Sequence, residues 1–376
     1  MLASTKTAEP PASPRARWLI GLISEHRELA IRLAERPDLL VIESDPLSGT
    51  SALLNLALTD VDLPIVPVDA RVAGSAIDLA MAIATAGITR LAPQAASWWN
   101  GIGTPDVEGL RLARALSQRG IDLEQLRFGT GVGSEQLRHA LELVAELSEG
   151  VGLLAIDHVD DLLERLSARA ADALLGVLRA EHQRSGSLRQ LLVGRVNGRL
   201  ASAVHDPGHP LYRAGDILQV RRPRPHRFVD DLAIGRSWTS ASVELIGAAA
   251  ELAAGAPAYV WRIVDAATAQ TGMHGAPALA AWRQLRESAE PSTAQQFRLL
   301  GSLHRAAPTV VCTIASGIGP YELPLNPKSI SDAVTRMRAR GQVFSPEKQR
   351  WAISDPLLAA WARDNAPIWV GRRAQR

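Results

Sequence analysis

The chain has 376 residues, of which 47% are hydrophobic and 21% are charged, so it is long enough to bury a large core in two or three domains. Its single cysteine, Cys312, excludes an internal disulfide framework and a zinc site built from cysteines. No apolar run reaches the roughly 20 residues that a membrane helix needs, and the apolar stretch behind the Pro-, Ala- and Ser-rich first 16 residues is too short for a signal sequence. These features predict a cytoplasmic protein that contacts no membrane.

The net charge of +2 is unevenly distributed along the chain. Residues 291–376 contain 12 Lys and Arg against 5 Asp and Glu, a net charge of +7, which leaves the first 290 residues with −5. A basic end on an acidic body favours a polyanionic partner, most simply double-stranded DNA. A basic surface that serves only solubility is the alternative.

Short apolar runs alternate with helical patterns in the first half of the chain. The runs at residues 39–42, 64–69, 151–157 and 190–194 read as buried strands, and helical spacing occupies 25–35, 52–58, 76–86 and 160–179. Fully apolar strands that alternate with helices predict an α/β fold, a parallel sheet with helices on both faces.

Beyond the basic stretch at residues 221–227 the strand pattern stops. Residues 228–286 are rich in alanine and almost entirely helical in spacing, which predicts a compact helical lid. The predicted organisation is a disordered leader (1–17), an α/β core (18–227), the helical lid (228–290) and a C-terminal domain (291–376).

One stretch between a predicted strand and a predicted helix has the place of a phosphate-binding loop. The helix N-terminus offers N–H groups and the positive end of its dipole to a triphosphate. The usual loop pattern is G-x-x-x-x-G-K-[ST], in which the lysine reaches the β- and γ-phosphates and the hydroxyl holds magnesium. Residues 44–51 read Ser-Asp-Pro-Leu-Ser-Gly-Thr-Ser, so Gly49 and Ser51 fit, whereas Ser44 replaces the first glycine and Thr50 the lysine. The predicted nucleotide-binding residues of this loop are Ser48, Gly49, Thr50 and Ser51.

The threonine at position 50 has a chemical consequence. A threonine cannot neutralise the charge that grows as a phosphoryl group departs, and loss of one such stabilising group costs on the order of 10²–10³ in rate. Asp45 adds a negative charge to the same loop. We therefore expect hydrolysis to be slow or absent.

A second acidic position follows the apolar run at residues 153–156. Asp157 at the end of a buried strand can hold a magnesium ion through water, and the next position usually carries a carboxylate that orients the attacking water. Here that position is His158, whose ordinary pKa near neutrality suits a base; a histidine that only packs at the strand end is the alternative. Asp160 and Asp161 are expected to cap the next helix.

Four further segments complete a resemblance that covers roughly residues 19–367. Leu-Leu-Val-Gly-Arg at 191–195 resembles a sensor strand, and His-Pro-Leu-Tyr-Arg at 209–213 a P-L-Y-G-R segment that has lost its glycine. Residues 255–257 match a G-x-P element, and 353–361 match the ending I-x-D-P-L-x-x-x-W. In motif order the chain resembles the STAND class of AAA+-type P-loop NTPases, especially the archaeal-type ATPase branch. The positions at which this chain differs from the family pattern are all expected at the nucleotide site. The loop lysine and the second acid are missing, and the G-R-E signature reads Ser-Glu-His at residues 24–26.

The resemblance implies a P-loop NTPase core, and ATP or ADP with magnesium as ligands. It places Arg195 near the γ-phosphate and Pro257 near the adenine, and it makes Ser51 and Asp157 the magnesium ligands if a nucleotide binds. Asp157, His158 and Arg195 are then the candidate catalytic residues. A vestigial pocket would bind neither nucleotide nor metal.

The resemblance also implies a winged helix at the C-terminus. A helix is predicted from residue 295 to 306, and a second from Ser329, read as its N-cap, to about Arg340, before two strands around a wing. Such a helix can enter the major groove while the wing touches phosphates. The predicted DNA-binding residues are Thr335, Arg336, Arg338 and Arg340 on the helix and Lys348 and Arg350 on the wing. Docking of a protein partner or self-association is the alternative use of this domain.

Three functions follow from these patterns. The first is an impaired ATPase that acts as a nucleotide-responsive or structural regulator or scaffold and contacts DNA. The second is an active ATP-hydrolysing switch in which His158 and Arg195 replace the missing groups. The third is a protein-interaction module with a vestigial pocket.

Overall fold

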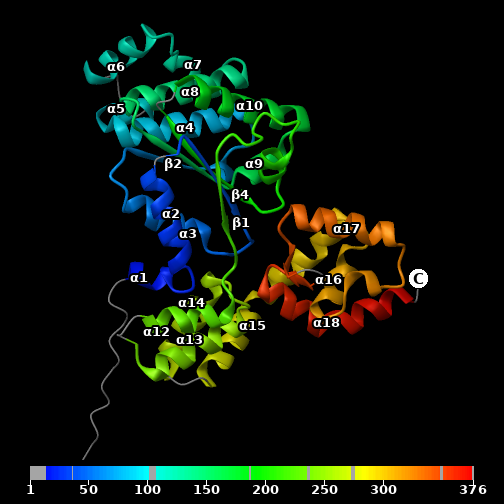
Figure 1. Cartoon of the computed structure of the whole chain (residues 1–376). Coiled ribbons are helices and arrows are strands. Elements are labelled where there is room, and N and C mark those ends of the chain that lie inside the picture. Colours follow the sequence, from blue (N-terminus) through cyan, green and yellow to red (C-terminus); the bar gives the residue numbers. More distant parts are fainter. Residues whose placement is uncertain are drawn as a thin grey trace, which may run out of the picture. The chain divides into compact units, whose positions relative to one another are not determined.

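The computed structural model describes residues 14–35, 37–100, 107–185, 188–234, 238–271, 276–347 and 350–374. Most of the predicted leader and Lys348 of the predicted wing lie outside these ranges. The chain divides into two compact units (Figure 1). Unit 1 comprises the described residues up to Arg27, Asp45–Leu56 and Val220–Arg376, and unit 2 comprises Glu28–Ser44 and Ala57–Gln219. Among the described helices, none combines the length and the apolar character that a membrane span requires.

A five-stranded parallel sheet with the strand order β2-β3-β4-β1-β5 organises unit 2. Ser44 pairs with Arg195 and Asp69 with Asp157, so neighbouring strands end in register at the carboxyl edge of the sheet. The predicted α/β architecture is confirmed. The strands are β1 (Leu39–Ser44), β2 (Ile65–Asp69), β3 (Leu153–Asp157), β4 (Arg189–Arg195) and β5 (Asp216–Val220).

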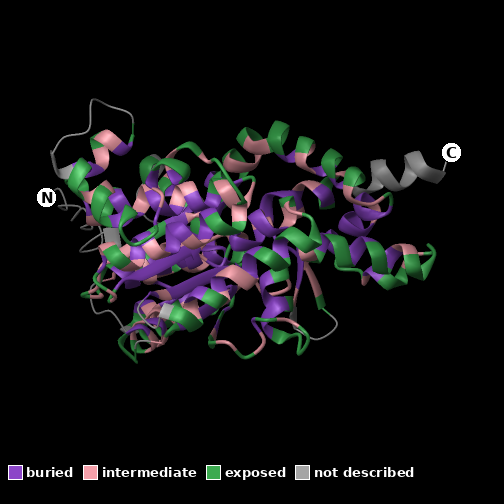
Figure 2. Cartoon of the chain, turned by 90° about the horizontal axis from the view of Figure 1, so that it is seen from above, coloured by how far each residue is buried: buried purple, intermediate pink, exposed green. Residues whose placement is uncertain are grey.

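The central strands β3, β4 and β1 are buried on both faces because apolar residues fill both of their sides, as the buried strands in Figure 2 show. In β1, Leu39 and Val41 enter the main core of unit 2, whereas Leu40 and Ile42 point to the opposite face and are buried as well. Figure 1 shows α4, α8 and α10 on one side of the sheet and α2 on the other. Burial of each such leucine stabilises the fold by about 1.5–3 kcal/mol. The buried strands therefore hold the residues at their carboxyl ends in defined positions.

The four helical segments predicted in this part of the chain are present, but further helices at Pro93–Trp99, Val107–Ser117, Leu123–Phe128, Gly133–Leu147 and Arg199–His205 were not among those predicted segments. The helix predicted over residues 160–179 is two helices, because the chain breaks at Leu166 and Ser167, whose hydroxyl oxygen accepts a bond from the N–H of Ala170 at 3.3 Å. The helices are α2 (Ile23–Glu35), α3 (Thr50–Thr59), α4 (Ala76–Leu91), α5 (Pro93–Trp99), α6 (Val107–Ser117), α7 (Leu123–Phe128), α8 (Gly133–Leu147), α9 (Val159–Arg165), α10 (Ala168–Ser185) and α11 (Arg199–His205), of which α2 and α3 are shared with unit 1.

The helical segment after β5 forms the second core, in unit 1. Phe228, Trp261 and Trp282 pack there with alanines and leucines of neighbouring helices. This agrees with the predicted Ala-rich helical lid. The helices are α1 (Pro14–Leu19), α12 (Pro225–Ile234), α13 (Ser240–Leu252), α14 (Pro257–Thr271) and α15 (Ala276–Leu303).

A third core, also in unit 1, belongs to the C-terminal module, which is the end of α15 with α16, α17, β6, β7 and α18. The elements are α16 (Ala307–Ala315), α17 (Pro327–Ala339), the antiparallel strands β6 (Val343–Glu347) and β7 (Arg350–Ile353), and α18 (Pro356–Ala374). Cys312 is buried in α16, and its burial raises the pKa of the thiol to about 11.

Two predictions for this module are wrong. The helix predicted from residue 295 begins at Ala276 and runs through Pro291, where the chain was expected to change domain. The N-cap of α17 is Asn326, whose side chain accepts a bond from the N–H of Lys328, and not Ser329. Pro327 at the first helical position explains the earlier start, because its fixed φ suits a helix N-terminus.

Candidate functional site

The predicted phosphate loop lies between β1 and α3, with the order strand, loop and helix that the sequence predicts. Two of its residues have left-handed backbone, Leu47 with φ 57° and Gly49 with φ 86°. A Cβ atom at Gly49 would lie 3.0 Å from Leu22 and 3.2 Å from Pro257. Glycine is therefore required here, and Pro257 of α14, which the resemblance places near the adenine, lies directly beside the loop.

The hydroxyl groups of the loop are bonded to the protein itself. The hydroxyls of Ser48 and Thr50 lie 2.7 Å apart in a hydrogen bond, and both residues are buried. The hydroxyl of Ser44, which replaces the first glycine, donates to the carbonyl of Gly194 at 3.0 Å and so ties β1 to β4. Ser51 is half-buried in the first turn of α3. The position that a lysine usually holds thus carries a buried, paired hydroxyl and no positive charge.

Two arginines from the connection after β5 approach the same loop. Arg221 forms an ion pair with Asp45 at 3.2 Å, and the backbone N–H of Arg222 donates to the same carboxylate at 3.1 Å. The guanidinium of Arg222 donates to the carbonyl of Pro46 at 3.0 Å. The negative charge of the loop is therefore balanced locally. The sequence shows these arginines only as the end of the strand pattern, and it gives no sign that they return to residues 45 and 46.

A second polar group lies in unit 2, at the carboxyl ends of β2 and β3. His158 Nδ1 lies 3.3 Å from Asp157 Oδ2 and 3.5 Å from Asp69 Oδ1, and the backbone of His158 is left-handed with φ 59°. Asp69 receives several hydrogen bonds from Arg71, the shortest at 2.6 Å, and these lower the pKa of its carboxyl. Left-handed backbone at a non-glycine residue is common at functional sites. The register of the sheet brings Asp69 to this site, which the sequence analysis missed.

Arg195, the predicted sensor arginine, is engaged by carboxylates of α9. Its guanidinium donates to Asp161 at 3.2 Å and to Glu164 at 2.5 Å. The arginine ends β4, as the sequence predicts, but its side chain already has anionic partners within unit 2.

Asp160 does not cap a helix, contrary to the prediction. The N-cap residue of α9 is His158, and Asp160 is buried, with its carboxylate facing backbone N–H groups of the β4–α11 turn. It accepts from the N–H of Arg195 at 2.6 Å and of Leu200 at 2.9 Å. Burial raises the pKa of Asp160, and these N–H donors oppose that shift.

The donor groups limit which metal could be held. Ser51 in unit 1 offers a hydroxyl and Asp157 in unit 2 a carboxylate, and each by itself is an oxygen ligand of a kind that magnesium accepts. Within the described ranges, no group of three or more His, Cys, Asp or Glu side chains is placed to hold a metal ion.

The predicted DNA-binding residues divide into three groups. Thr335 and Arg338 are exposed on α17, opposite the buried Ile330, Ala333, Val334 and Met337, and Arg340 is exposed directly after the helix. The guanidinium of Arg336 instead donates to the carbonyl of Leu303 at 3.0 Å, at the end of α15. Arg350 is exposed at the start of β7, and Lys348 lies outside the described residues.

The motif at residues 353–361 joins the C-terminal module to α14. Asp355 accepts a hydrogen bond from the hydroxyl of Tyr259 at 3.2 Å, and it also accepts from the N–H of Leu357 at 2.8 Å at the start of α18. Trp361 packs against Phe297 with ring centroids 4.7 Å apart. The motif thus supplies a helix cap, a link to α14 and a core contact.

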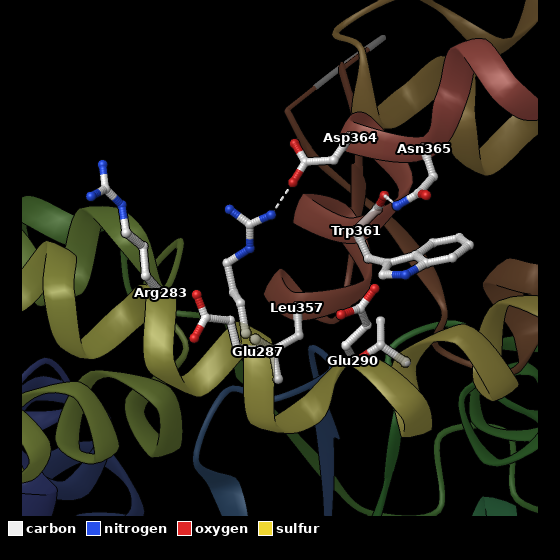
Figure 3. Close-up of a pocket in the computed structure, with 9 residues that line it drawn as sticks. Arg283, Glu287, Glu290, Leu357, Trp361, Asp364 and Asn365 are labelled. Atoms are coloured by element: carbon white, nitrogen blue, oxygen red, sulfur yellow. Dashed lines mark hydrogen bonds and ion pairs between the residues drawn. The ribbon is translucent and has the colours of Figure 1, made fainter.

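Unit 1 also contains a pocket of about 320 Å³ between α15 and α18 (Figure 3). Arg286 of α15 forms an ion pair with Asp364 of α18 at this pocket. None of the predicted nucleotide-binding residues lines this pocket, so it is distinct from the phosphate loop. The lining residues are Arg283, Arg286, Glu287, Glu290, Thr293, Leu357, Trp361, Asp364 and Asn365.

The solved structures that match nearly the whole chain include the following two. One is a Walker-type ATPase of Pyrococcus abyssi, with a TM-score of 0.62 and 16% identity over 90% of this chain and 95% of that one. The other is the ORC2 protein of Aeropyrum pernix in ADPNP–ADP complexes, with a TM-score of 0.51 and 12% identity over 99% and 98%. No family model matches the sequence, and no curated protein does. The likeness is one of fold.

Proposed function

We propose that this chain, which has the fold of archaeal-type P-loop ATPases, is a nucleotide-responsive regulator or scaffold that hydrolyses ATP slowly or not at all. The observation that carries the proposal is the buried hydrogen bond between Ser48 and Thr50 at 2.7 Å. It lies where a phosphate-binding lysine would begin. A hydroxyl already paired to a neighbour supplies neither the charge nor the reach of a lysine.

Binding of a nucleotide requires fewer specialised side chains than its hydrolysis does, because backbone N–H groups alone can hold phosphate oxygens. The first N–H groups of α3 lack intrahelical acceptors, as at any helix start, and they favour an anion. Gly49 gives the loop its left-handed backbone, and Pro257 lies beside it. The similar ORC2 protein of Aeropyrum pernix was solved with ADPNP and ADP. These observations support ATP or ADP as the ligand class, with Ser48, Gly49, Thr50, Ser51 and Pro257 as the binding residues.

The catalytic assignments follow from the same proposal. With a nucleotide bound, Ser51 and Asp157 would hold its magnesium ion, which neutralises phosphate charge. His158 and Arg195 are the groups available to orient water and to pair with the γ-phosphate. His158 lies against two carboxylates and Arg195 against Asp161 and Glu164. Because Arg195 must leave these partners before it can serve a phosphate, we expect little turnover.

The test combines binding and turnover in three proteins. Calorimetric titration with ATP and magnesium should show binding to wild type, and phosphate release should be near background. Thr50→Lys should raise turnover by roughly 10²-fold, the factor expected for one stabilising group. Thr50→Val, which has a similar shape and no hydroxyl, is the matched control and should leave turnover unchanged.

Other outcomes separate the alternatives. Substantial wild-type turnover that is lost in Asp157→Asn would support the active switch instead. Absence of ATP and ADP binding to wild type would support a protein-interaction module with a vestigial pocket.

We further propose that the C-terminal module is a winged helix that contacts double-stranded DNA. The support is the net charge of +7 over residues 291–376 and the outward position of Thr335 and Arg338 on α17, with Arg340 exposed after it. Lys348 and Arg350 would contact phosphates from the wing. The affinity of the full chain for duplex DNA should fall steeply with salt, because each phosphate contact releases counterions. A response independent of salt would favour a protein partner or self-association through this module.

The division into a core (18–227), a helical lid (228–290) and a C-terminal domain (291–376) is part of the proposal. Pro291 lies inside α15, so a continuous helix joins the last two parts. Limited proteolysis should then cut before α15 more readily than at residue 291. Rapid cleavage at 291 would indicate a flexible boundary there.

A further inference from the structure

The side chain of Arg222 joins the phosphate loop to the C-terminal module. It lies in the connection between β5 and α12, and its guanidinium donates to the carbonyl of Pro46 at 3.0 Å. The same guanidinium donates to the carbonyl of Ser354 at 2.7 Å, directly before α18. It also lies over the ring of Phe344 in β6, 4.6 Å from the centroid. One arginine thus contacts two parts of the chain that lie more than 300 residues apart in sequence.

The surroundings of Arg222 hold it in this position. Only 8% of the residue is exposed, and this burial lowers the pKa of the guanidinium to about 10. Asp45 and Asp355 oppose that shift. A buried charge needs partners for its donors, and removal of one partner is costly. The position of the guanidinium therefore depends on both carbonyl groups and on both carboxylates.

The loop end of this contact has a sparsely populated backbone conformation. The carbonyl of Pro46 belongs to the peptide that precedes Leu47, a non-glycine residue with φ 57°. Phosphate-binding loops hold their ligand with backbone N–H groups, so a bound phosphate favours a particular orientation of each peptide. Left-handed backbone at such a residue is held by its surroundings, and Arg222 supplies part of them.

We propose that Arg222 is a tether through which nucleotide occupancy of the loop changes the mobility of the C-terminal module. When phosphate reorients the peptide between Pro46 and Leu47, the carbonyl of Pro46 leaves the guanidinium. The guanidinium of Arg222 then keeps the carbonyl of Ser354 as an acceptor but has lost that of Pro46. It is held less firmly, and its contact with the ring of Phe344 weakens. The inference rests on the proposed nucleotide binding, and it adds the route by which the ligand is sensed.

Helix α14 provides a second connection between the phosphate loop and the C-terminal module. The hydroxyl of Tyr259 donates to Asp355, the residue after Ser354. Pro257, two residues earlier, lies beside Gly49 of the loop. A ligand that displaces Pro257 would therefore act on Asp355, while a ligand that moves Pro46 would act on Ser354 through Arg222.

The test is hydrogen exchange of the full-length wild type, with and without ATP and magnesium. Binding should change the exchange of amides at residues 343–345 and 350–358 by about fivefold, the factor that one net hydrogen bond contributes. Changes confined to residues 45–56, with none in the C-terminal module, would overturn the proposal. Absence of ATP binding in a parallel titration would count against the proposed function itself.

Variants then assign the effect to Arg222. Arg222→Lys keeps the charge but cannot reach both carbonyls with a fork of donors, and it should bind ATP while losing the response at residues 350–358. Arg363→Met is the matched control, because its guanidinium also donates to a carbonyl, that of Ala315 at 3.0 Å, within the module alone. It should keep the response. If Arg222→Lys does not fold, Phe344→Leu removes the ring contact alone and should weaken the response; an unchanged response in either folded variant contradicts the tether.

Discussion

The carboxylate of Asp160 accepts a hydrogen bond of 2.6 Å from the backbone N–H of Arg195. Its other oxygen accepts from the N–H of Leu200 at 2.9 Å, so one side chain of α9 holds both sides of the turn between β4 and α11. Gly198 lies in that turn, and a Cβ atom there would come within 2.1 Å of the carboxylate. The turn and the carboxylate are therefore matched in shape, and the position of Arg195 depends on both.

Asp160→Asn should destabilise the protein by about 1–3 kcal/mol. The side-chain NH₂ of the asparagine would replace one carboxylate oxygen, so the backbone N–H of Arg195 or of Leu200 would lose its acceptor. Chemical denaturation of variant and wild type measures the difference. Asp161→Asn is the control, since Asp161 contacts the side chain of Arg195 and not its backbone; its cost should stay below about 1 kcal/mol. Equal losses in the two variants would contradict a special role for Asp160.

Releasing Arg195 should improve nucleotide binding. The double variant Asp161→Asn with Glu164→Gln removes both anionic partners of the guanidinium, which then becomes available to a phosphate. We expect affinity for ATP to rise by about tenfold, which corresponds to about 1.4 kcal/mol, as measured by calorimetry. Adding Arg195→Met to the double variant should abolish the gain. A gain that survives this third substitution would show that repulsion by the carboxylates, and not Arg195, limits binding.

The pair of Asp69 and Arg71 should contribute to stability at neutral pH and not in acid. Hydrogen bonds from Arg71 lower the pKa of Asp69 below its ordinary value of 3.8. The folded state therefore favours the ionised carboxylate, and its contribution is complete above that value and is lost as pH falls below it. The pair is partly exposed, so we expect only about 0.2–1 kcal/mol. Denaturation of Asp69→Asn and Arg71→Met between pH 7 and about 3 should show a shallower acid loss than wild type; an unchanged slope in both would refute the assignment.

Gly49→Ala should destabilise the loop for two reasons. The residue has φ 86°, and the new methyl group would meet Leu22 and Pro257. We expect a loss of about 1–3 kcal/mol in thermal or chemical unfolding. Gly317→Ala is the control for backbone strain alone, because Gly317 has φ 76° with open space around it, and it should cost about 1 kcal/mol. The difference between the two free energies of unfolding measures the cost of the contacts with Leu22 and Pro257. No difference would mean that these side chains can move aside at no cost.

Two neighbouring arginines of α17 should behave differently. Arg338→Ala should weaken DNA binding and reduce the salt slope by about 1, as expected for one phosphate contact, with stability unchanged. Arg336→Ala should lower stability by about 0.5–1.5 kcal/mol, because its guanidinium bonds the carbonyl of Leu303. Fluorescence anisotropy at several salt concentrations and denaturation of both variants make the comparison. The reverse pattern would place Arg336, and not Arg338, at the DNA.

The sequence was sufficient to predict most strands of the sheet, because a strand that is buried on both faces appears in the sequence as a continuous apolar run. Four of the five strands are apolar runs, and each of them ends within about two residues of its prediction. The fifth, β5, was missed because Asp216 and Gln219 are exposed and only half of the strand is buried. A strand with one polar face at the edge of a sheet resembles a loop in sequence.

The first residues of helices were less predictable than the strands, because more than one nearby residue is of a type that can serve as the N-cap. Ser329 and Asn326 both suit an N-cap, and Pro327 decided between them by fixing the first helical residue. Pro291 was expected near a boundary, yet α15 continues through it. Tertiary packing on both sides can hold a helix that its proline disfavours.

The residues themselves determined the absence of a lysine in the phosphate loop, the parallel sheet and the basic C-terminal module, since composition and periodicity are local properties. Only the folded chain decided that the carboxylates of α9 hold Arg195, that Asp69 joins His158, and that Arg222 contacts both Pro46 and Ser354. Those contacts join residues distant in sequence. Their partners are set by strand register and by packing, which a linear pattern does not encode.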